Sequence, residues 1–364
     1  MKEFLRQHKK LHIWLLADLV LLAAYFLCRG NRAWMNALAD HVTTPLKHGL
    51  GSLCYRTEVS VMEVLYALAI LLGLVYVVWS VVAVVRAKGR RGSRAYGAVL
   101  GAADIVLALW AVFCLLWGVN FWTDSFQDRS GITAQPVALE DLTEVTAYFA
   151  DQLAAAADTV DRDERGVFAV SKDDILRESV AVYDPLEQRF PFLTFDDPGV
   201  KAMAFSRFMS IIGFTGFYCA YTGESNVNVD SPACLLPATA AHELAHQRGI
   251  ASEQECNFLA VLASTTSGND AYVYSGCLMG FIYLGNALYA ADPDTYWAIR
   301  DTLPETVAAD LRDNNAYWDQ FRDNAAEKVS NKVYDGMLKA YGDEKGIQSY
   351  GTVVDLLVTY YREK

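Results

Sequence analysis

Three long apolar runs dominate the first third of the chain. They extend from Leu11 to Cys28, from Val59 to Val85 and from about Tyr96 to Trp117. Each run is long enough for a helix to cross the hydrocarbon core of a bilayer. No small-x-small cleavage site follows the first run, and two further runs come after it. We therefore expect an uncleaved anchor and three transmembrane helices, with residues 29–58 as a mixed loop between the first two.

After residue 119 the pattern changes to shorter amphipathic segments. Val227 and Val229 alternate with Asn226 and Asn228, which is the pattern of a half-buried strand. Elsewhere apolar positions recur at helical spacing, over residues 137–160, 172–190, 236–249, 252–260, 271–289, 294–301, 314–341 and 348–361. We expect a break or kink at Pro185 and a possible break within 314–341. The sequence predicts a mainly α protein: a membrane domain of residues 1–119 with three transmembrane helices, then a mostly helical domain of residues 120–364 with at most a small β-sheet.

The two parts also differ in charge. Residues 1–119 carry 13 basic and 6 acidic residues, and residues 120–364 carry the other 18 of 31 basic and 37 of 43 acidic residues. Residues 120–364 are therefore strongly acidic. This argues against nucleic acid or anionic lipid as their partner, because binding to either needs clustered Lys and Arg. The seven cysteines include no C-x-x-C pair, so neither a disulfide framework nor a zinc ribbon is indicated.

Basic residues also predict the direction of the spans. Four lie in the first ten residues and five in residues 86–94, against four spread through residues 29–58. Cytoplasmic loops are the ones enriched in Lys and Arg. We therefore expect the N-terminus and the hairpin at residues 86–94 in the cytoplasm, and residues 120–364 on the extracytoplasmic side.

One stretch carries recognisable chemistry. His242, Glu243 and His246 form the pattern H-E-x-x-H. In a helix the two histidines lie one turn apart on one face, where both imidazoles can hold a metal ion. Glu243 lies about 100° further round, so its carboxylate can act as a base towards a water without binding the metal itself.

The segment around this motif favours a helix. Pro237 suits the first turn, the centre is rich in alanine, and Gly249 suits a left-handed stop. The alternative is a purely structural helix whose histidines bind no metal.

A zinc site needs a third protein donor. The other four histidines all precede residue 49, so a carboxylate is the expected donor, with Glu253 and Glu255 as the near choices. Ser252 and Glu255 match a capping box, which already gives Glu255 a use. We therefore favour Glu253 as the third ligand and keep Glu255 as the alternative.

These residues resemble known proteins. Glu253 followed by Asn257 is similar to the E-x-x-x-D/N arrangement of glutamate-type zincins, in which the carboxylate binds the metal and the polar residue supports a histidine. Four segments, residues 205–207, 213–218, 222–228 and 242–258, resemble the bacterial domain-of-unknown-function family 3810. The resemblance extends to the three-span N-terminus and to residues 327–330 and 349–350. It implies a membrane-anchored protein with a zincin-like site.

The chain departs from the family pattern at three positions. Ser252, Gln254 and Cys256 stand where the family has Arg, Asp and Ala, and we expect only local surface contacts to change. The strand expected at residues 222–230 lies where zincins place the edge strand that binds an extended substrate; the alternative is a connecting loop.

The resulting hypothesis is a zinc-dependent metallopeptidase in the bacterial cell membrane that hydrolyses peptide bonds outside it. Zinc would be held by His242, His246 and Glu253, and Glu243 would be the catalytic base. Arg207, Tyr334 and Tyr350 are candidates for stabilising the oxyanion. The expected partners are a peptide or protein substrate and the lipid bilayer, and the oligomeric state is not predicted.

The alternative hypothesis is a non-catalytic receptor or scaffold that binds metal or peptide outside the membrane. Its cytoplasmic parts would be a tail and a hairpin of about ten residues each, which is too short for an effector domain. This shortage favours the enzyme.

Overall fold

The computed structural model describes residues 6–196, 198–322, 324–341 and 350–362, and the chain forms two compact units. Unit 1 contains the chain up to residue 50 together with residues 61–123 and 220–222. Unit 2 contains residues 51–60, 124–219 and those from 223 onward. Each unit is therefore assembled from segments that are not contiguous in sequence.

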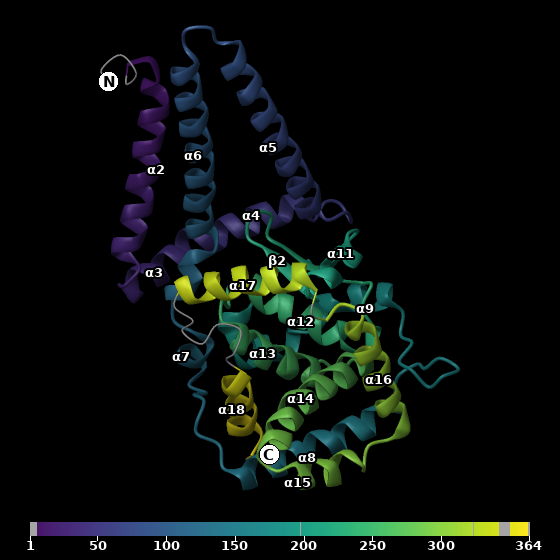
Figure 1. The fold of residues 1–364 in the computed structure, drawn as a ribbon. Coiled ribbons are helices and arrows are strands. Elements are labelled where there is room, and N and C mark those ends of the chain that lie inside the picture. The colour runs from purple at the N-terminus through teal and green to yellow at the C-terminus, as the bar shows by residue number, and fades with distance from the viewer. Residues whose placement is uncertain (1–5, 197, 323, 342–349, 363–364) are drawn as a thin grey trace. The chain divides into compact units, whose positions relative to one another are not determined.

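The three apolar runs form the long helices of unit 1, which confirms the predicted spans (Figure 1). These are α2 (Lys9–Cys28), α5 (Val61–Arg86) and α6 (Arg91–Leu116), each long and apolar enough to cross a membrane. Large side chains on α5 point outward, with Leu71 56% and Val78 63% exposed. Such a continuous apolar surface is what lipid-facing helices present.

The chain between the first two spans is helical, so the predicted mixed loop at residues 29–58 was wrong. It forms α3 (Arg32–Leu38), the π-helix η1 (Ala39–Thr43) and α4 (Thr44–Cys54). Asn31 caps α3 by accepting a hydrogen bond from the Trp34 N–H at 3.1 Å. Met35 and Ala39 are buried with Val119, which lies in the 3-10 helix η2 (Gly118–Trp122). This burial stabilises helices that the local pattern did not indicate.

Unit 2 is mainly helical. Around its core lie α7 (Phe126–Ser130), α8 (Leu139–Ala156), α12 (Leu236–Gln247), α13 (Glu253–Thr266), α14 (Asp270–Ala291), α15 (Pro293–Arg300), α16 (Glu305–Asp319), α17 (Ala325–Ala340) and α18 (Tyr350–Tyr361). Shorter pieces are α9 (Lys172–Glu178), η3 (Ser179–Ala181), α10 (Asp184–Arg189), η4 (Pro191–Leu193), α11 (Ser206–Ile211) and η5 (Ala233–Leu235).

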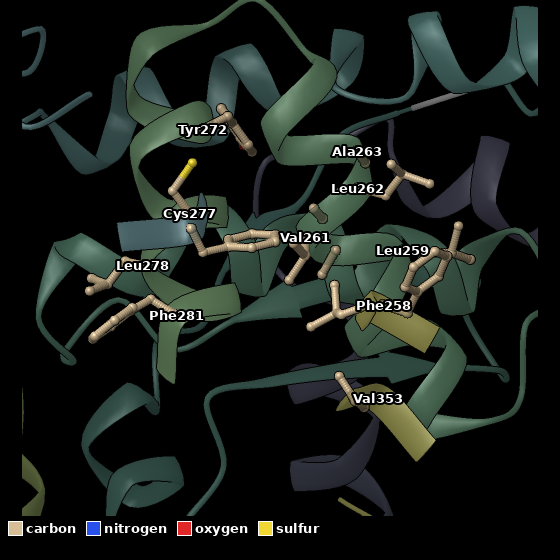
Figure 2. Packing of buried hydrophobic residues seen from close by; sticks show 14 of the residues in the cluster. Phe258, Leu259, Val261, Leu262, Ala263, Tyr272, Cys277, Leu278, Phe281 and Val353 are labelled. Carbon is tan, nitrogen blue, oxygen red and sulfur yellow. The ribbon is translucent and has the colours of Figure 1, made fainter. Parts of the chain in front are cut away.

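The core of unit 2 is built on α13 and α14. Figure 2 shows Phe258 and Leu259 of α13, Phe281 of α14 and Val353 of α18 as members of one cluster of buried apolar side chains. All four side chains are almost completely buried. Burying an apolar side chain of this size stabilises the fold by about 1.5–3 kcal/mol. Helices α13 and α14 therefore form a rigid base for the segments that carry the polar residues of interest.

Two predicted helices are interrupted. Residues 172–190 form α9, η3 and α10 in succession, and Pro185 stands in the first turn of α10, where its missing N–H has no cost. The possible break within 314–341 is also present, because this segment is the end of α16 and the whole of α17. Asn324 caps α17 by accepting from the Glu327 N–H at 2.8 Å, so its side chain begins a new helix.

A small sheet of three strands packs on α12. Strand β1 (Lys201–Ala202) is parallel to β3 (Glu224–Val227), and β2 (Gly216–Cys219) is antiparallel to β3. The order is β1-β3-β2, so β3 is the central strand. All four residues of β3 are buried. The segment at 222–230 is therefore neither half-buried nor an edge strand, and that prediction was wrong because β2 covers its second edge.

Candidate metal centre

Helix α12 ends where the sequence predicts. Pro237 lies in its first turn, and the helix ends at Gln247. Gly249 has φ of 89°, a left-handed conformation that residues with a Cβ rarely adopt. The turn at Gly249 reverses the chain, and α13 begins four residues later at Glu253. Residues of α13 thereby return to the face of α12 that carries the histidines.

The structure brings His242, His246 and Glu253 together. One ligand-type atom from each lies within 4.8 Å of the others. His242 Nε2 is 3.3 Å from Glu253 Oε2, and His246 Nε2 is 3.4 Å from Glu253 Oε1. The three side chains therefore converge. Tyr334, which also contacts Glu253, lies 81 residues further along the chain.

Both imidazoles are held through their other nitrogen. His242 Nδ1 lies 2.8 Å from Asn257 Oδ1, which is the contact expected from the spacing of Glu253 and Asn257. His246 Nδ1 lies 2.8 Å from the Ile250 carbonyl oxygen. Each oxygen can only accept here, so each Nδ1 carries a proton and donates it. In the neutral ring this leaves the Nε2 lone pair directed at Glu253.

This arrangement fits a metal ion. A neutral Nε2 and a carboxylate oxygen are both acceptors, so they approach each other only if a proton or a cation lies between them. Two donors bound tetrahedrally to one zinc ion at about 2.0–2.2 Å stand about 3.3 Å apart. The two measured separations match this value. Histidines that bind a metal usually donate their other ring N–H to an oxygen, as His242 and His246 do to Asn257 and Ile250.

Without a metal, the electrostatics of the three residues are those of an ion pair. Burial lowers the pKa of His246, but the neighbouring Cys256 and Glu253 raise it by more, so the net shift is well upward. Burial raises the pKa of Glu253, and the two imidazoles outweigh this and hold it well below its usual value. The carboxylate is therefore ionised and available to a cation.

Glu243 lies beside these three residues but makes different contacts. Its side chain is buried, and Oε2 has no hydrogen-bond partner among the described residues. Burial raises the pKa of the Glu243 carboxyl to about 7, although the nearby His242 and His246 lower it. A pKa near neutrality suits a general base, and an unpaired buried oxygen is free to bind a water or a substrate group.

The free edge of strand β2 lies against Glu243. A Cβ at Gly216 would lie 2.7 Å from the Glu243 Cγ and 2.8 Å from its Cδ, so only glycine fits there. The Tyr218 backbone also hydrogen-bonds Glu243. The carbonyl oxygens of Thr215 and Cys219 accept hydrogen bonds from N–H groups within residues 223–228, so these two residues face β3. Successive residues of a strand direct their backbone groups to opposite edges, so the Tyr218 N–H faces the other edge of β2. The edge strand beside the site is thus β2, which sequence reasoning missed.

Glu255 points away from the histidines. Its carboxylate accepts hydrogen bonds from the backbone N–H groups of Phe126 at 2.9 Å and Gln127 at 3.1 Å, at the N-terminus of α7. Of the predicted capping box, only the bond from the Glu255 N–H to the Ser252 side chain is present. The second half was wrong, because the Glu255 carboxylate is used by a different helix.

Of the three candidates for oxyanion stabilisation, Tyr334 lies at the site. Its hydroxyl on α17 donates to Glu253 Oε1, and its ring lies 5.5 Å from that of Phe214. Arg207 instead pairs with Asp230 at 3.1 Å. The side chain of Tyr350 lies outside the described residues. Only the position of Tyr334 in space, and no local pattern, distinguishes it from the other tyrosines.

The departures from the family pattern reach beyond the surface. Gln254 and Cys256 are buried, and the Cys256 Sγ lies 3.3 Å from His246 Nδ1. The expectation that only surface contacts change was therefore wrong for these two positions. Cys256 is one of seven cysteines, all of which are free thiols.

Fold and geometry together define a class of protein. Its members have three candidate membrane spans and a helical unit. In that unit, the H-E-x-x-H helix and the helix after it bring two histidines and a glutamate together. The chain belongs to the family described as "Protein of unknown function (DUF3810)", which matches residues 42–358. No curated protein and no solved structure matches it.

Proposed function

We propose that the chain is a membrane-anchored zinc-dependent metallopeptidase that acts on the extracytoplasmic side. The observation that carries the proposal is the convergence of His242, His246 and Glu253 beside the buried Glu243, whose Oε2 has no hydrogen-bond partner among the described residues. A zinc ion bound there would supply Lewis acidity and lower the pKa of a water to about 7. This is the combination that peptide hydrolysis at neutral pH requires.

The residues of the chain have distinct roles in this proposal. Glu243, with a pKa near 7 before metal binding, takes a proton from the attacking water and passes it to the leaving amine. Asn257 keeps His242 in the tautomer that offers Nε2. Tyr334 places a hydroxyl at Glu253, where it can donate to a developing oxyanion.

The same proposal gives β2 the role of substrate platform. Strand β2 is an edge strand of the sheet and lies against Glu243, and an extended peptide can pair with such an edge as an added strand. Gly216 keeps this edge close to the carboxylate. A bound peptide bond would then lie within reach of both the metal ligands and the base.

Metal content and hydrolysis test the proposal on the purified full-length protein in lipid. Wild type is expected to contain one zinc per chain and to cleave a peptide library. Glu243→Gln is expected to keep the zinc and lose hydrolysis, while His242→Ala loses both. Glu305→Gln removes an exposed carboxylate and serves as the matched control that retains activity.

Two results would contradict the proposal in different ways. A wild-type protein without stoichiometric zinc would leave His242, His246 and Glu253 as a structural ion pair. Zinc bound without hydrolysis of any peptide would favour the metal- or peptide-binding receptor, and in that case Glu243→Gln should keep whatever signal the protein gives.

A further inference from the structure

Helix α11 presents an apolar face that the rest of unit 2 does not cover. Phe205, which precedes it, is 59% exposed, and Phe208 one turn later is 57% exposed. Ile211 continues the same face at 38%. Large aromatic side chains at helical spacing rarely stay in water, and such patches mark an interaction surface.

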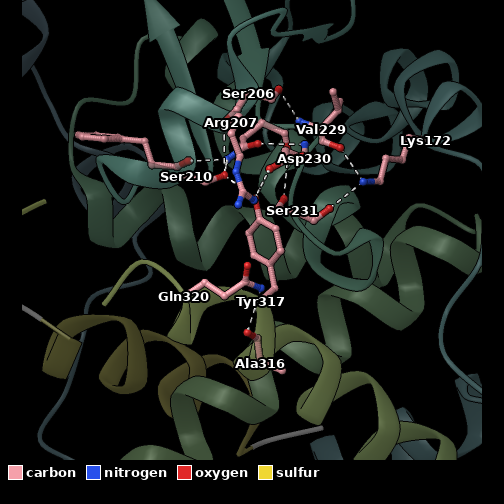
Figure 3. A network of polar contacts seen from close by, with 12 residues as sticks. Lys172, Ser206, Arg207, Ser210, Val229, Asp230, Ser231, Ala316, Tyr317 and Gln320 are labelled. Carbon is pink, nitrogen blue, oxygen red and sulfur yellow. Dashed lines mark hydrogen bonds and ion pairs between the residues drawn. The ribbon is translucent and has the colours of Figure 1, made fainter. Parts of the chain in front are cut away.

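The opposite face of α11 fixes it firmly to unit 2. Ser206 Oγ accepts from the Val229 N–H at 2.9 Å, and Ser210 Oγ lies 2.5 Å from the Tyr317 hydroxyl. Figure 3 shows this network from α11 to Asp230 and Tyr317. The two phenylalanines are therefore held outward on a rigid element, and their exposure is not the result of a loose end.

The helix carries one charge, and that charge is neutralised. Arg207 pairs with Asp230 at 3.1 Å and lies 4.5 Å from the centre of the Phe321 ring. Its charge is thus directed along unit 2. Arg207 is itself 58% exposed, and the other exposed side chains of α11, Phe208 and Ile211, are apolar. Because the one charge is already paired with Asp230, the face that carries the two apolar side chains suits insertion among hydrocarbon chains more than attraction to anionic groups.

Hydrogen bonds within unit 2 join the segment before α11 to the segment from which α5 begins. Lys201, in β1, donates to the carbonyl oxygens of Cys54 and Val59, both at 2.9 Å. Val59 lies two residues before α5 begins at Val61. Phe205 follows Lys201 by four residues, a reach of at most about 14 Å. A span that starts beside Val59 therefore brings the bilayer surface within reach of the phenylalanines.

We propose that Phe205, Phe208 and Ile211 insert into the interfacial region of the bilayer and hold unit 2 against it. The partner is the lipid acyl and glycerol region, reached by apolar contact. Because unit 2 is acidic, the contact is expected in neutral vesicles as readily as in anionic ones and to survive high salt. The proposal does not depend on metal binding or hydrolysis.

Photocrosslinking of the full-length protein in lipid vesicles tests it. One variant replaces Phe208 with the photoreactive amino acid benzoylphenylalanine, and the control replaces Trp297 of α15 in the same way. Trp297 is an aromatic residue that is 45% exposed on a different helix of unit 2. Vesicles of phosphatidylcholine, with and without phosphatidylglycerol, are irradiated at low and high salt.

The expected result is an adduct with the mass of one lipid, several-fold more abundant at position 208 than at 297 and equal in both vesicle types. Equal yields at 208 and 297 would overturn the proposal, as would a protein of twice the chain mass, which would make the face a contact between copies. An adduct confined to anionic vesicles at low salt would also overturn it, since binding would then be electrostatic.

Discussion

At the scale of single residues, the site depends on what lies between the Nε2 atoms and Glu253. Both measured gaps are longer than a good hydrogen bond, 3.3 and 3.4 Å, yet each joins atoms that are acceptors in the neutral state. A proton between them gives an ion pair. The separations and the two Nδ1 contacts are also those that a metal ion held by the three side chains would need.

Asn257 is the sharpest test of this interpretation. Asn257→Ala removes the oxygen that orients His242, so zinc affinity is expected to fall by about 10- to 100-fold, in the range seen for outer-shell partners. Competition titration with a chelating dye measures the change. Thr266→Ala, at the exposed end of the same helix, is the control and should leave affinity unchanged. Equal affinities in both variants would count against a metal at this position.

A substitution at Tyr334 tests zinc binding and peptide hydrolysis independently. Tyr334→Phe keeps the ring against Phe214 and removes the hydroxyl at Glu253, so zinc content should persist while kcat falls by about 100-fold. The exposed neighbour Val333, changed to Ala, is the control on α17. Loss of zinc together with activity would show that Tyr334 supports the ligand and has no role in turnover.

At the scale of elements, Gly216 lets β2 approach the Glu243 side chain of α12 closely. Gly216→Ala would place a methyl group against the Glu243 carboxylate, so either the strand or the base must move. We expect destabilisation of about 1–3 kcal/mol and loss of hydrolysis. Chemical denaturation and a peptidase assay measure both.

Gly336 is the matched control for this substitution. It lies within α17 with nothing within 4 Å of a Cβ, so Gly336→Ala should be neutral or stabilise that helix by about 0.5–1 kcal/mol. If Gly216→Ala behaved in the same way, the close approach of β2 to Glu243 would be refuted.

Tyr55 joins three further elements. Its hydroxyl donates to the Gly199 carbonyl oxygen and accepts from the Ser225 N–H of β3, both at 2.9 Å, and from Gln247 of α12 at 3.2 Å. Tyr55→Phe leaves these buried groups unpaired, so the free energy of unfolding should fall by about 1–3 kcal/mol. Tyr289→Phe, at an exposed position of α14, should not change it.

The elements also show which features the sequence alone can predict. The three spans, α12 and the stop at Gly249 depend on local periodicity and backbone preference, and these were predicted. The contact of His242 with Asn257 is the one that the resemblance to glutamate-type zincins implies. The use of Glu255 could not be predicted, because its partner Phe126 lies 129 residues earlier. The burial of β3 likewise depends on β2 and α12, whose pairing no local pattern encodes.

At the scale of the whole molecule, the remaining question is which side of the membrane carries unit 2. Four basic residues near the N-terminus and five at residues 86–94 predict that both lie in the cytoplasm. With three spans, we therefore expect the chain after α6 on the outer side. Alkaline phosphatase fused after Lys364 should be active, since that enzyme folds only where disulfides form.

The same charges offer a test by reversal. Changing Arg86, Lys88, Arg90, Arg91 and Arg94 to glutamine removes the bias that holds the hairpin inside, so a measurable fraction of chains should insert inverted and phosphatase activity per chain should fall. Neutralising the four basic residues within 29–58 should have the opposite effect or none. A fusion that is inactive in the wild type would place His242, His246 and Glu253 in the cytoplasm. Peptides outside the cell would then be beyond the reach of the site, even if it binds zinc.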